Sequence, residues 1–293
     1  MDASPEVELA LDAGADLGEG PTWDAGTDAL VWVDITPGLV HRFDPATGTD
    51  ETWDVGQPVG AAVPTRSGRL ALAAQDRFAI LDPANGRVDL LAEVEADLPT
   101  TMMNDGKCDA AGRFWAGTKD VEGRRPFGSL YRLDADHGLV RVLTDVTISN
   151  GIGWSPDGRT MYYIDSPTHG IDAFDFEPET AAESNRRRLV DFPTGWGLPD
   201  GMTVDEEGHL WVAFWDGAAV RRITPDGRIV SVVAFPASRV TSCAFGGPDL
   251  ADLYVTSARN GLSPEQLRDQ PNAGGLFRLR PGVRGLPEHP YAG

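Results

Sequence analysis

The strongest constraint on the fold of this chain is a repeat of about 45 residues that occurs six times. In each unit, a turn precedes a short run rich in β-branched and aromatic residues, as in ALVWVDI (29–35), RFWAGT (113–118) and HLWVAF (209–214). Further strand-like runs follow, separated by turns such as DPATG and TPDG, in which proline presets φ and glycine accepts a positive φ. Four strands per unit at this period are typical of a β-propeller blade.

Each unit has one residue that leads into its first strand, which we call its anchor residue. Successive anchors are separated by 41, 44, 46, 50 and 42 residues, and they are Glu19, Gly60, Asn104, Asn150, Asp200 and Ser242. Six units use the whole chain, so we expect a single domain over residues 1–293. The predicted fold is all-β: a six-bladed β-propeller with four antiparallel strands per blade.

Two segments stand outside the six-fold pattern. The early run VELALDAG (7–14) precedes the first unit, and we expect it to supply the outer strand of the last blade and so close the ring. The segment SPEQLRDQ (263–270) predicts a short helix inserted in the last blade, with Ser263 as its N-cap and Pro264 at its first position.

Composition narrows the classes of partner. With 25 Lys and Arg against 45 Asp and Glu, the net charge of −20 disfavours nucleic acid and membrane surfaces as partners. No apolar run approaches the roughly 18 residues of a membrane span, and the acidic first residues do not resemble a signal peptide. Two distant cysteines make no disulfide framework, which favours a reducing, cytoplasmic location. The sequence leaves the oligomeric state open.

In a propeller, the residues that lead into the first strands crowd around one mouth of the central channel. Four anchors carry side-chain oxygens: Glu19, Asn104, Asn150 and Asp200. Two carboxylates with carboxamide oxygens suit one divalent cation, for which Ca²⁺, Mg²⁺, Mn²⁺, Zn²⁺ and Fe²⁺ are the candidates. The same residues are good turn formers, so the residues alone leave metal binding and turn chemistry equally open. Asp105, one position further along an extended segment, is expected to point the other way.

Several longer motifs resemble one known family. They include LGEGPTWD (17–24), NDGKCDAAGRFWAGT (104–118), ISNGIGWSPDGRTMYYIDS (148–166) and LPDGMTVDEEGHLWVA (198–213), in that order and across nearly the whole chain. This ordered set resembles the SMP-30/gluconolactonase/LRE family, which is built as a six-bladed propeller with one divalent metal in its channel.

The resemblance implies a role for individual residues. The metal ligands of the family fall on Glu19, Asn150 and Asp200, and Asp200 is also expected to act as the catalytic base. Asn104 is expected to lie near the metal and to contact substrate or bound water. Glu122 falls on a glutamate that contacts sugar hydroxyls in the family.

Two further residues are expected at the substrate. The family commonly has an arginine two positions before the NDGK asparagine, where this chain has Met102. Because methionine offers no donor and arginine offers five, the substrate is not expected to be a common aldonolactone. Trp196, in a loop beside Asp200, is expected to form a wall of the substrate site.

Together these features predict a divalent-metal-dependent lactonase that hydrolyses a sugar-type or related lactone, a small molecule, to its hydroxy acid. Two alternatives stay open at this point. One is a calcium-binding propeller that acts as a scaffold without catalysis. The other is an esterase or phosphotriesterase that uses the same metal centre.

Overall fold

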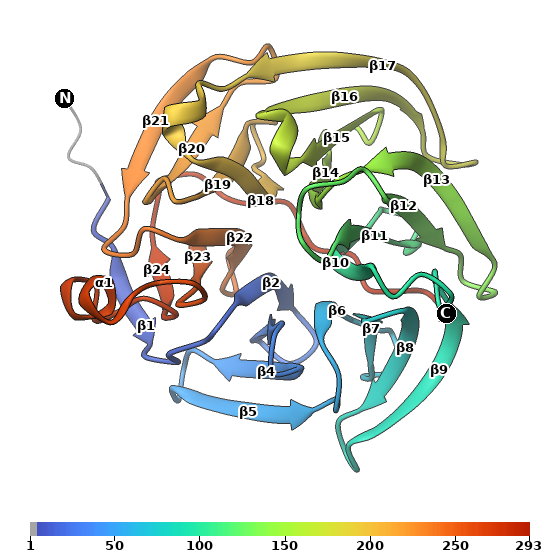
Figure 1. Cartoon of the computed structure of the whole chain (residues 1–293), viewed down its shortest axis with the longest axis horizontal. Coiled ribbons are helices and arrows are strands. Elements are labelled where there is room, and N and C mark those ends of the chain that lie inside the picture. Colours follow the sequence, from blue (N-terminus) through green and yellow to red (C-terminus); the bar gives the residue numbers. More distant parts are fainter. Residues whose placement is uncertain (1–4) are drawn as a thin grey trace.

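The six predicted units form six blades around one axis. The computed structural model describes residues 5–293, and it contains six antiparallel sheets of four strands each (Figure 1). In every sheet the strands pair in the order inner to outer, so that the first strand of each blade lies nearest the axis. The predicted six-bladed β-propeller is confirmed.

The strands of the first three blades have the following bounds. Blade 1 contains β2 (Gly18–Asp24), β3 (Ala29–Asp34), β4 (Leu39–Asp44) and β5 (Thr49–Asp54). Blade 2 contains β6 (Val59–Pro64), β7 (Leu70–Ala74), β8 (Arg77–Asp82) and β9 (Arg87–Glu93). Blade 3 contains β10 (Thr101–Cys108), β11 (Phe114–Asp120), β12 (Gly128–Leu133) and β13 (Leu139–Val146).

The remaining blades follow the same plan. Blade 4 contains β14 (Ser149–Trp154), β15 (Thr160–Asp165), β16 (Gly170–Glu177) and β17 (Ala182–Asp191). Blade 5 contains β18 (Leu198–Val204), β19 (Leu210–Trp215), β20 (Ala219–Ile223) and β21 (Ile229–Ala234). Blade 6 contains β22 (Val240–Gly246), β23 (Asp252–Ser257), β24 (Leu276–Leu279) and β1 (Glu8–Leu11).

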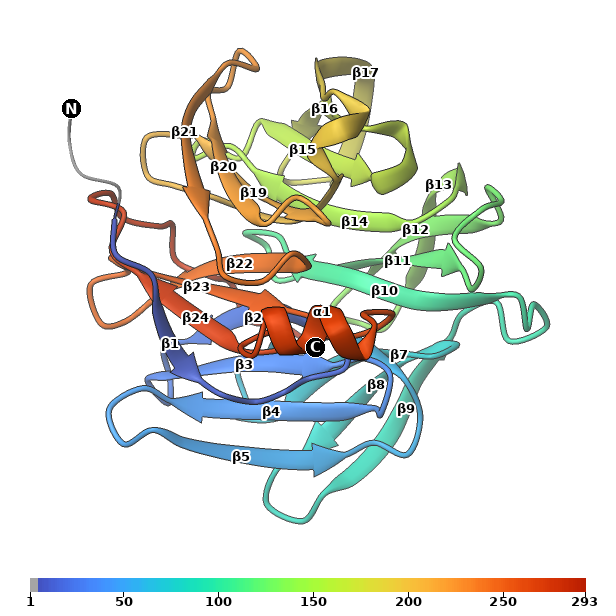
Figure 2. The same cartoon turned by 60° about the vertical axis from the view of Figure 1, so that its left-hand side comes forward.

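The ring closes through the N-terminal strand, as the sequence predicts. β1 pairs antiparallel with β24, with Glu8 opposite Arg278 and Leu9 opposite Phe277. Figure 2 shows β1 lying along the outer side of β24. The last blade combines the N-terminal strand β1 with three strands from the C-terminal part of the chain. Unfolding of either end of the chain would therefore expose a strand edge.

The predicted helix insertion is also confirmed. Helix α1 (Pro264–Asp269) lies between β23 and β24, and Ser263 caps it through a capping box with Gln266. Two single turns of 3-10 helix, η1 (Ser166–Thr168) and η2 (Thr194–Trp196), complete the helical elements. Among the described residues, no helix has the length and apolar character needed to cross a lipid bilayer.

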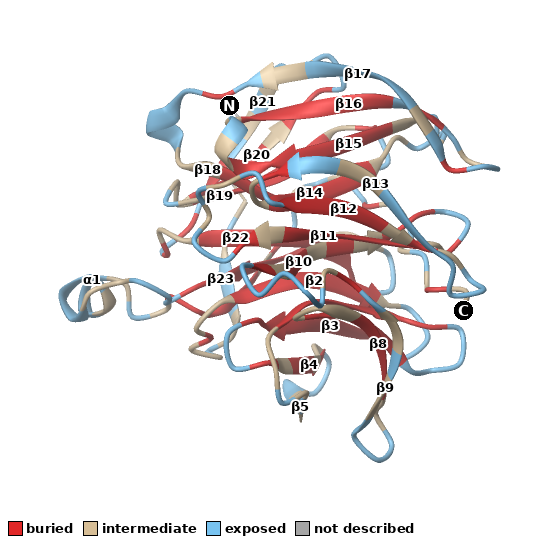
Figure 3. Ribbon diagram, turned by 45° about the vertical axis from the view of Figure 1, so that its right-hand side comes forward, coloured by how far each residue is buried: buried red, intermediate tan, exposed pale blue. Residues whose placement is uncertain are grey.

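The apolar core lies between neighbouring blades. The second strands β3 and β7 are buried at every position, whereas the outer strands β5 and β13 are mostly exposed (Figure 3). Rings from adjacent blades pack edge to face, as Phe78 and Phe114 do with their centroids 5.3 Å apart. The inner strands add Cys108 and Cys243, which are both buried and form no disulfide.

A repeated turn motif fixes two of the inner hairpins. The sequences DAAGRFW (109–115) and DEEGHLW (205–211) place an aspartate six residues before a tryptophan. In both turns the buried carboxylate accepts a hydrogen bond from the indole Nε1, at 2.8 Å from Trp115 to Asp109 and at 2.9 Å from Trp211 to Asp205. The repeat in the sequence therefore has a direct cause, because each buried indole needs a hydrogen-bond acceptor and the aspartate of the turn supplies it.

The C-terminal tail, residues 284–293, crosses the end of the propeller opposite the anchor residues. It meets the turns that follow the inner strands: Glu206 N donates to Arg284 O at 2.9 Å, and Tyr291 N donates to Pro64 O at 2.8 Å. Figure 1 shows the tail passing from blade 6 behind the inner strands to the side of blades 2 and 3. The tail thus ties blades on opposite sides of the ring to one another.

Tyr291 attaches this tail to the propeller, since its side chain is fully buried and its hydroxyl donates to Asp134 O at 2.8 Å. We expect Tyr291→Ala to lower the free energy of unfolding by about 3–5 kcal/mol, because it leaves a cavity the size of an aromatic ring. Tyr291→Phe removes the hydrogen bond alone and should cost about 1 kcal/mol. Urea unfolding of both variants measures this, and equal small losses would show that the tail is not held by packing.

Candidate metal centre

Every inner strand breaks its register with its neighbour at the anchor residue. The breaks lie between Glu19 and Thr22, Val59 and Ala61, Met103 and Gly106, Ser149 and Ile152, Pro199 and Met202, and Val240 and Cys243. A β-bulge at this point bends the strand and re-aims a side chain. The anchors are therefore the same structural position in six blades, and four of them place their side chains in one cavity at one end of the channel.

Glycines beside the anchors let the inner strands approach one another. A Cβ on Gly60 would collide with the backbone of Asn104, and a Cβ on Gly151 would lie 2.7 Å from the carbonyl oxygen of Asp200. Real Cβ atoms essentially never come so close to a backbone oxygen. Gly60, itself an anchor, and Gly151, which follows Asn150, are thus conditions for bringing the anchor of the next blade close.

The four oxygen-bearing anchors line one cavity of about 280 Å³. Glu19, Asn104, Asn150 and Asp200 come from four different blades, and each is only 4–6% exposed. Other polar residues of the lining are Lys119, Asp120, Glu122, Ser166 and Asn260. Successive members of this set are 85, 46 and 50 positions apart in the sequence, and they become neighbours here, as the propeller repeat predicts.

The two asparagines are held through their amide nitrogens. Asn104 Nδ2 donates to Ser149 O at 2.8 Å, and Asn150 Nδ2 donates to Ser166 Oγ at 3.0 Å. The amide oxygen of Asn150 is buried and has no hydrogen-bond partner in the described part of the chain. A buried oxygen without a donor is costly, so this atom points to a ligand that the protein itself does not supply.

The two carboxylates of the cavity are close enough that the charge of one disfavours the charged form of the other. Burial raises the pKa of Glu19 well above its usual range, and the charge of Asp200 adds to this shift. Burial likewise raises the pKa of Asp200 well above its usual range, with a further contribution from Asp105. The positive charge of Lys119 acts in the opposite direction on both. A cation between Glu19 and Asp200 would remove this repulsion.

Asp105 contributes charge without lining the cavity. Its Oδ1 accepts a hydrogen bond from Gly106 N at 2.7 Å, and burial raises its pKa to about 6. Because the bulge of β10 includes both Asn104 and Asp105, simple alternation of side chains does not hold there. The carboxylate of Asp105 therefore stays close enough to affect Glu19 and Asp200.

The predicted substrate contacts divide into two groups. Asn104 and Glu122 line the cavity, Asn104 buried and Glu122 exposed on the loop after β11. Met102 does not line it and packs against an apolar cluster of blades 1 and 2. Trp196 does not line it either: it is 36% exposed, and the guanidinium of Arg221 lies 4.8 Å from its ring centroid.

Lys119 is the cavity residue that sequence reasoning missed. It lies near the end of β11, directly opposite Met102 in the β10–β11 register. Burial lowers the pKa of its ammonium group, against the charges of Asp200 and Glu19. The signal in the sequence was the lysine of AGTK, which continues a strand motif toward the channel mouth.

The donor set fits a divalent metal ion. Two carboxylates and the free amide oxygen of Asn150 are hard oxygen ligands, which Ca²⁺, Mg²⁺ and Mn²⁺ prefer. In residues 5–293 there is no group of three or more His, Cys, Asp and Glu placed to hold a metal. A site with two carboxylates leaves coordination positions for water and substrate, in contrast to a closed structural site.

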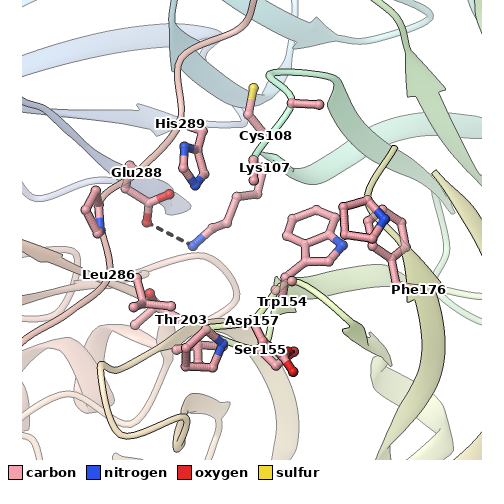
Figure 4. Close-up of a pocket in the computed structure, with 18 of the residues that line it drawn as sticks. Lys107, Cys108, Trp154, Ser155, Asp157, Phe176, Thr203, Leu286, Glu288 and His289 are labelled. Atoms are coloured by element: carbon pink, nitrogen blue, oxygen red, sulfur yellow. Dashed lines mark hydrogen bonds and ion pairs between the residues drawn. The ribbon is translucent and has the colours of Figure 1, made fainter. Parts of the chain in front are cut away.

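A larger cavity of about 380 Å³ lies at the other end of the channel, beside the C-terminal tail (Figure 4). Its lining includes Lys107, Glu288 and the indole of Trp154. Lys107 Nζ is paired with Glu288 Oε1 at 3.2 Å, so this charge is already matched within the protein. None of the predicted site residues lines this cavity. Size alone therefore does not identify the functional site.

Comparisons with known proteins agree with this architecture. The family model described as the SMP-30/gluconolactonase/LRE-like region matches residues 17–259 of this chain. Regucalcin of Gallus gallus is 42% identical over 284 residues, which cover 94% of this chain and 95% of that protein. Regucalcin of Danio rerio is 41% identical, with 99% and 100% covered.

A solved structure of regucalcin from Agrobacterium tumefaciens, described as a calcium-binding protein, has a TM-score of 0.94 at 30% identity and covers 99% of this chain and 97% of its own. These matches extend over nearly the whole propeller, including all four oxygen-bearing anchors. The chain belongs to the SMP-30/gluconolactonase/LRE-like family.

Proposed function

We propose that this protein is a divalent-metal-dependent lactonase that hydrolyses a sugar-type or related lactone to its hydroxy acid. One observation carries the proposal: four buried oxygen-bearing side chains from four blades line a single cavity. Membership of a family whose description includes gluconolactonase supports the choice of a lactone over other esters.

Glu19, Asn150 and Asp200 would hold the cation, with Asn104 beside it. A divalent cation bound there would polarise the ring carbonyl and lower the pKa of a coordinated water. Calcium is the first candidate, because a relative that matches 99% of this chain is described as calcium-binding. Mg²⁺, Mn²⁺, Zn²⁺ and Fe²⁺ are the alternatives that the activity assay must include.

Asp200 is the proposed general base. The burial that raises the pKa of its carboxyl also favours acceptance of a proton from an attacking water. The water oxygen forms a bond to the carbonyl carbon, the ring C–O bond breaks, and the proton passes from Asp200 to the departing ring oxygen. The product is the open-chain hydroxy acid.

Substrate contacts are proposed for the residues that line the cavity. Asn104 is fixed by Ser149 and orients substrate or water, while Glu122 lies at the exposed mouth, where it can accept hydrogen bonds from hydroxyl groups. Met102 and Trp196 stay predictions from the sequence, and each would need to act from outside this lining.

The first test is replacement of the base. We expect Asp200→Asn to lower kcat for lactone hydrolysis by about 10²–10⁴-fold, which is the usual contribution of a positioned base. Acid release is measured on a panel of lactones after the metal is stripped with a chelator and each of the five cations is added back. Asp28→Asn, in an exposed turn of blade 1, is the matched control and should hydrolyse at the wild-type rate.

This assay also separates the alternatives. A scaffold binds the cation without hydrolysis by either wild type or variant. An esterase or phosphotriesterase releases acid from linear esters or phosphotriesters faster than from any lactone. Absence of hydrolysis with every lactone and every cation would contradict the proposed activity.

The second test uses stability and pH. In the metal-free protein, the raised pKa of Glu19 means that the folded state holds more protons than the unfolded chain above about pH 4. The free energy of unfolding of the metal-free protein should therefore fall as pH rises toward that raised pKa. Since protons compete with the cation, the increase in Tm on adding metal should grow over the same range.

Glu19→Gln removes the charge that causes both effects. We expect this variant to have a higher Tm than wild type at pH 8 without metal, and to lose the increase in Tm on adding metal. Glu122→Gln changes an exposed carboxylate of the same cavity and should leave both quantities close to wild type. An undiminished metal-induced increase in the Glu19→Gln variant would exclude Glu19 as a ligand.

A further inference from the structure

We infer that Lys119 is a specificity-determining residue, and that the lactone taken by this cavity carries a carboxylate group, which the ammonium of Lys119 binds. The inference rests on the proposed lactonase function and goes beyond it by naming a substrate class. It follows from where the lysines of this chain lie and from how the charges of the cavity are matched.

The chain has two lysines against 23 arginines, and both lysines lie along the central channel. Lys107 points into the far cavity and is neutralised by Glu288 at 3.2 Å. Lys119 lines the cavity of the candidate metal centre. Its ammonium group has no hydrogen bond and no carboxylate within 4 Å among residues 5–293. Two lysines in similar channel positions thus differ in whether the protein supplies a counter-charge.

The side chain of Lys119 lines the cavity, whereas its partner in the strand register does not. Lys119 is directly opposite Met102 on β10, and opposite residues of an antiparallel pair present their side chains on the same face of the sheet. Met102 packs into the apolar cluster of blades 1 and 2. Because Met102 lies outside the lining and offers no donor, Lys119 is the residue of this opposed pair that presents a charged donor to the cavity.

The ammonium of Lys119 has no carboxylate within 4 Å among residues 5–293, and a bound divalent cation would not supply one. A divalent cation matches the two buried carboxylates Glu19 and Asp200. Asp120, also in the lining, is already matched by Arg125 at 3.0 Å. A partly buried ammonium without a counter-charge is unfavourable. A ligand with one negative charge should therefore bind here with a more favourable free energy than a neutral ligand.

The surroundings select a carboxylate over a phosphate. One ammonium group neutralises a single negative charge. Phosphate sites usually combine several donors, such as a bidentate arginine or a run of backbone N–H groups. Glu122 at the mouth would also repel a second negative charge. The cavity of about 280 Å³ is below the usual range for drug-sized ligands and suits a compact molecule such as one sugar unit.

The test compares two lactones that differ at one group. The 1,4-lactone of glucaric acid has a free carboxylate where the 1,4-lactone of gluconic acid has a hydroxymethyl group. We expect wild type, loaded with its most active cation, to show kcat/KM about 10- to 100-fold higher for the glucaric lactone, which is the range of a hydrogen bond to a charged group. Raising the salt concentration should shrink this ratio, because the cavity is open to screening ions.

Lys119→Met should bring the ratio of the two kcat/KM values close to one, mainly through KM for the glucaric lactone. Lys119→Arg retains the charge and should retain most of the ratio. Glu122→Gln removes a competing negative charge and should increase the ratio. The open-chain products give a readout that needs no turnover: calorimetry should show that glucarate binds more tightly than gluconate to wild type and equally to Lys119→Met.

The outcomes separate this inference from the proposed function. If both lactones are hydrolysed at equal rates, or if the preference survives in Lys119→Met, the inference is wrong while the lactonase function stands. If neither lactone is hydrolysed with any of the five cations, the lactonase function is wrong for these substrates, and the calorimetric comparison decides the role of Lys119. Preference for glucarate that is lost with Lys119 supports the inference in either case.

Discussion

The close approach of six inner strands at one end of the channel is the constraint on which the site depends. Each inner strand bulges at its anchor residue, and four of the six blades place an oxygen-bearing side chain in the lining of one cavity. Glycines make this possible, because a side chain on Gly60 or Gly201 would collide with the anchor of the next blade. The positions of the anchor side chains are thus set by the packing of the inner strands against one another.

The same packing sets the chemistry. Glu19 and Asp200 are buried close enough to raise each other's energy, and the oxygen of Asn150 is buried without a donor. Such features are costly in a protein that binds nothing, and a cation bound in this place would make ligands of these three groups. Under the proposal above, the ammonium of Lys119, which has no carboxylate within 4 Å among residues 5–293, would link metal binding to the choice of substrate.

Closure of the ring keeps this geometry rigid. β1 completes the last blade by pairing with β24, and the C-terminal tail joins blades across the opposite end of the channel. The pair between Lys107 and Glu288 lies at that end, in the lining of the larger cavity of about 380 Å³. One end of the channel is therefore crossed by the C-terminal tail, and the other holds the four oxygen-bearing anchors and the cavity that they line.

The sequence by itself determined the fold, the strand at the ring closure and the four oxygen-bearing anchors. These features follow from the residues of the turns and from a period of about 45 residues, and both can be read from a single sequence. Only the tertiary structure decided which neighbours share the cavity. It places Met102 in an apolar cluster and Trp196 beside Arg221, and it brings Lys119 to the ligand space. Cross-strand register and contacts between blades join residues far apart in the chain, and no local pattern records them.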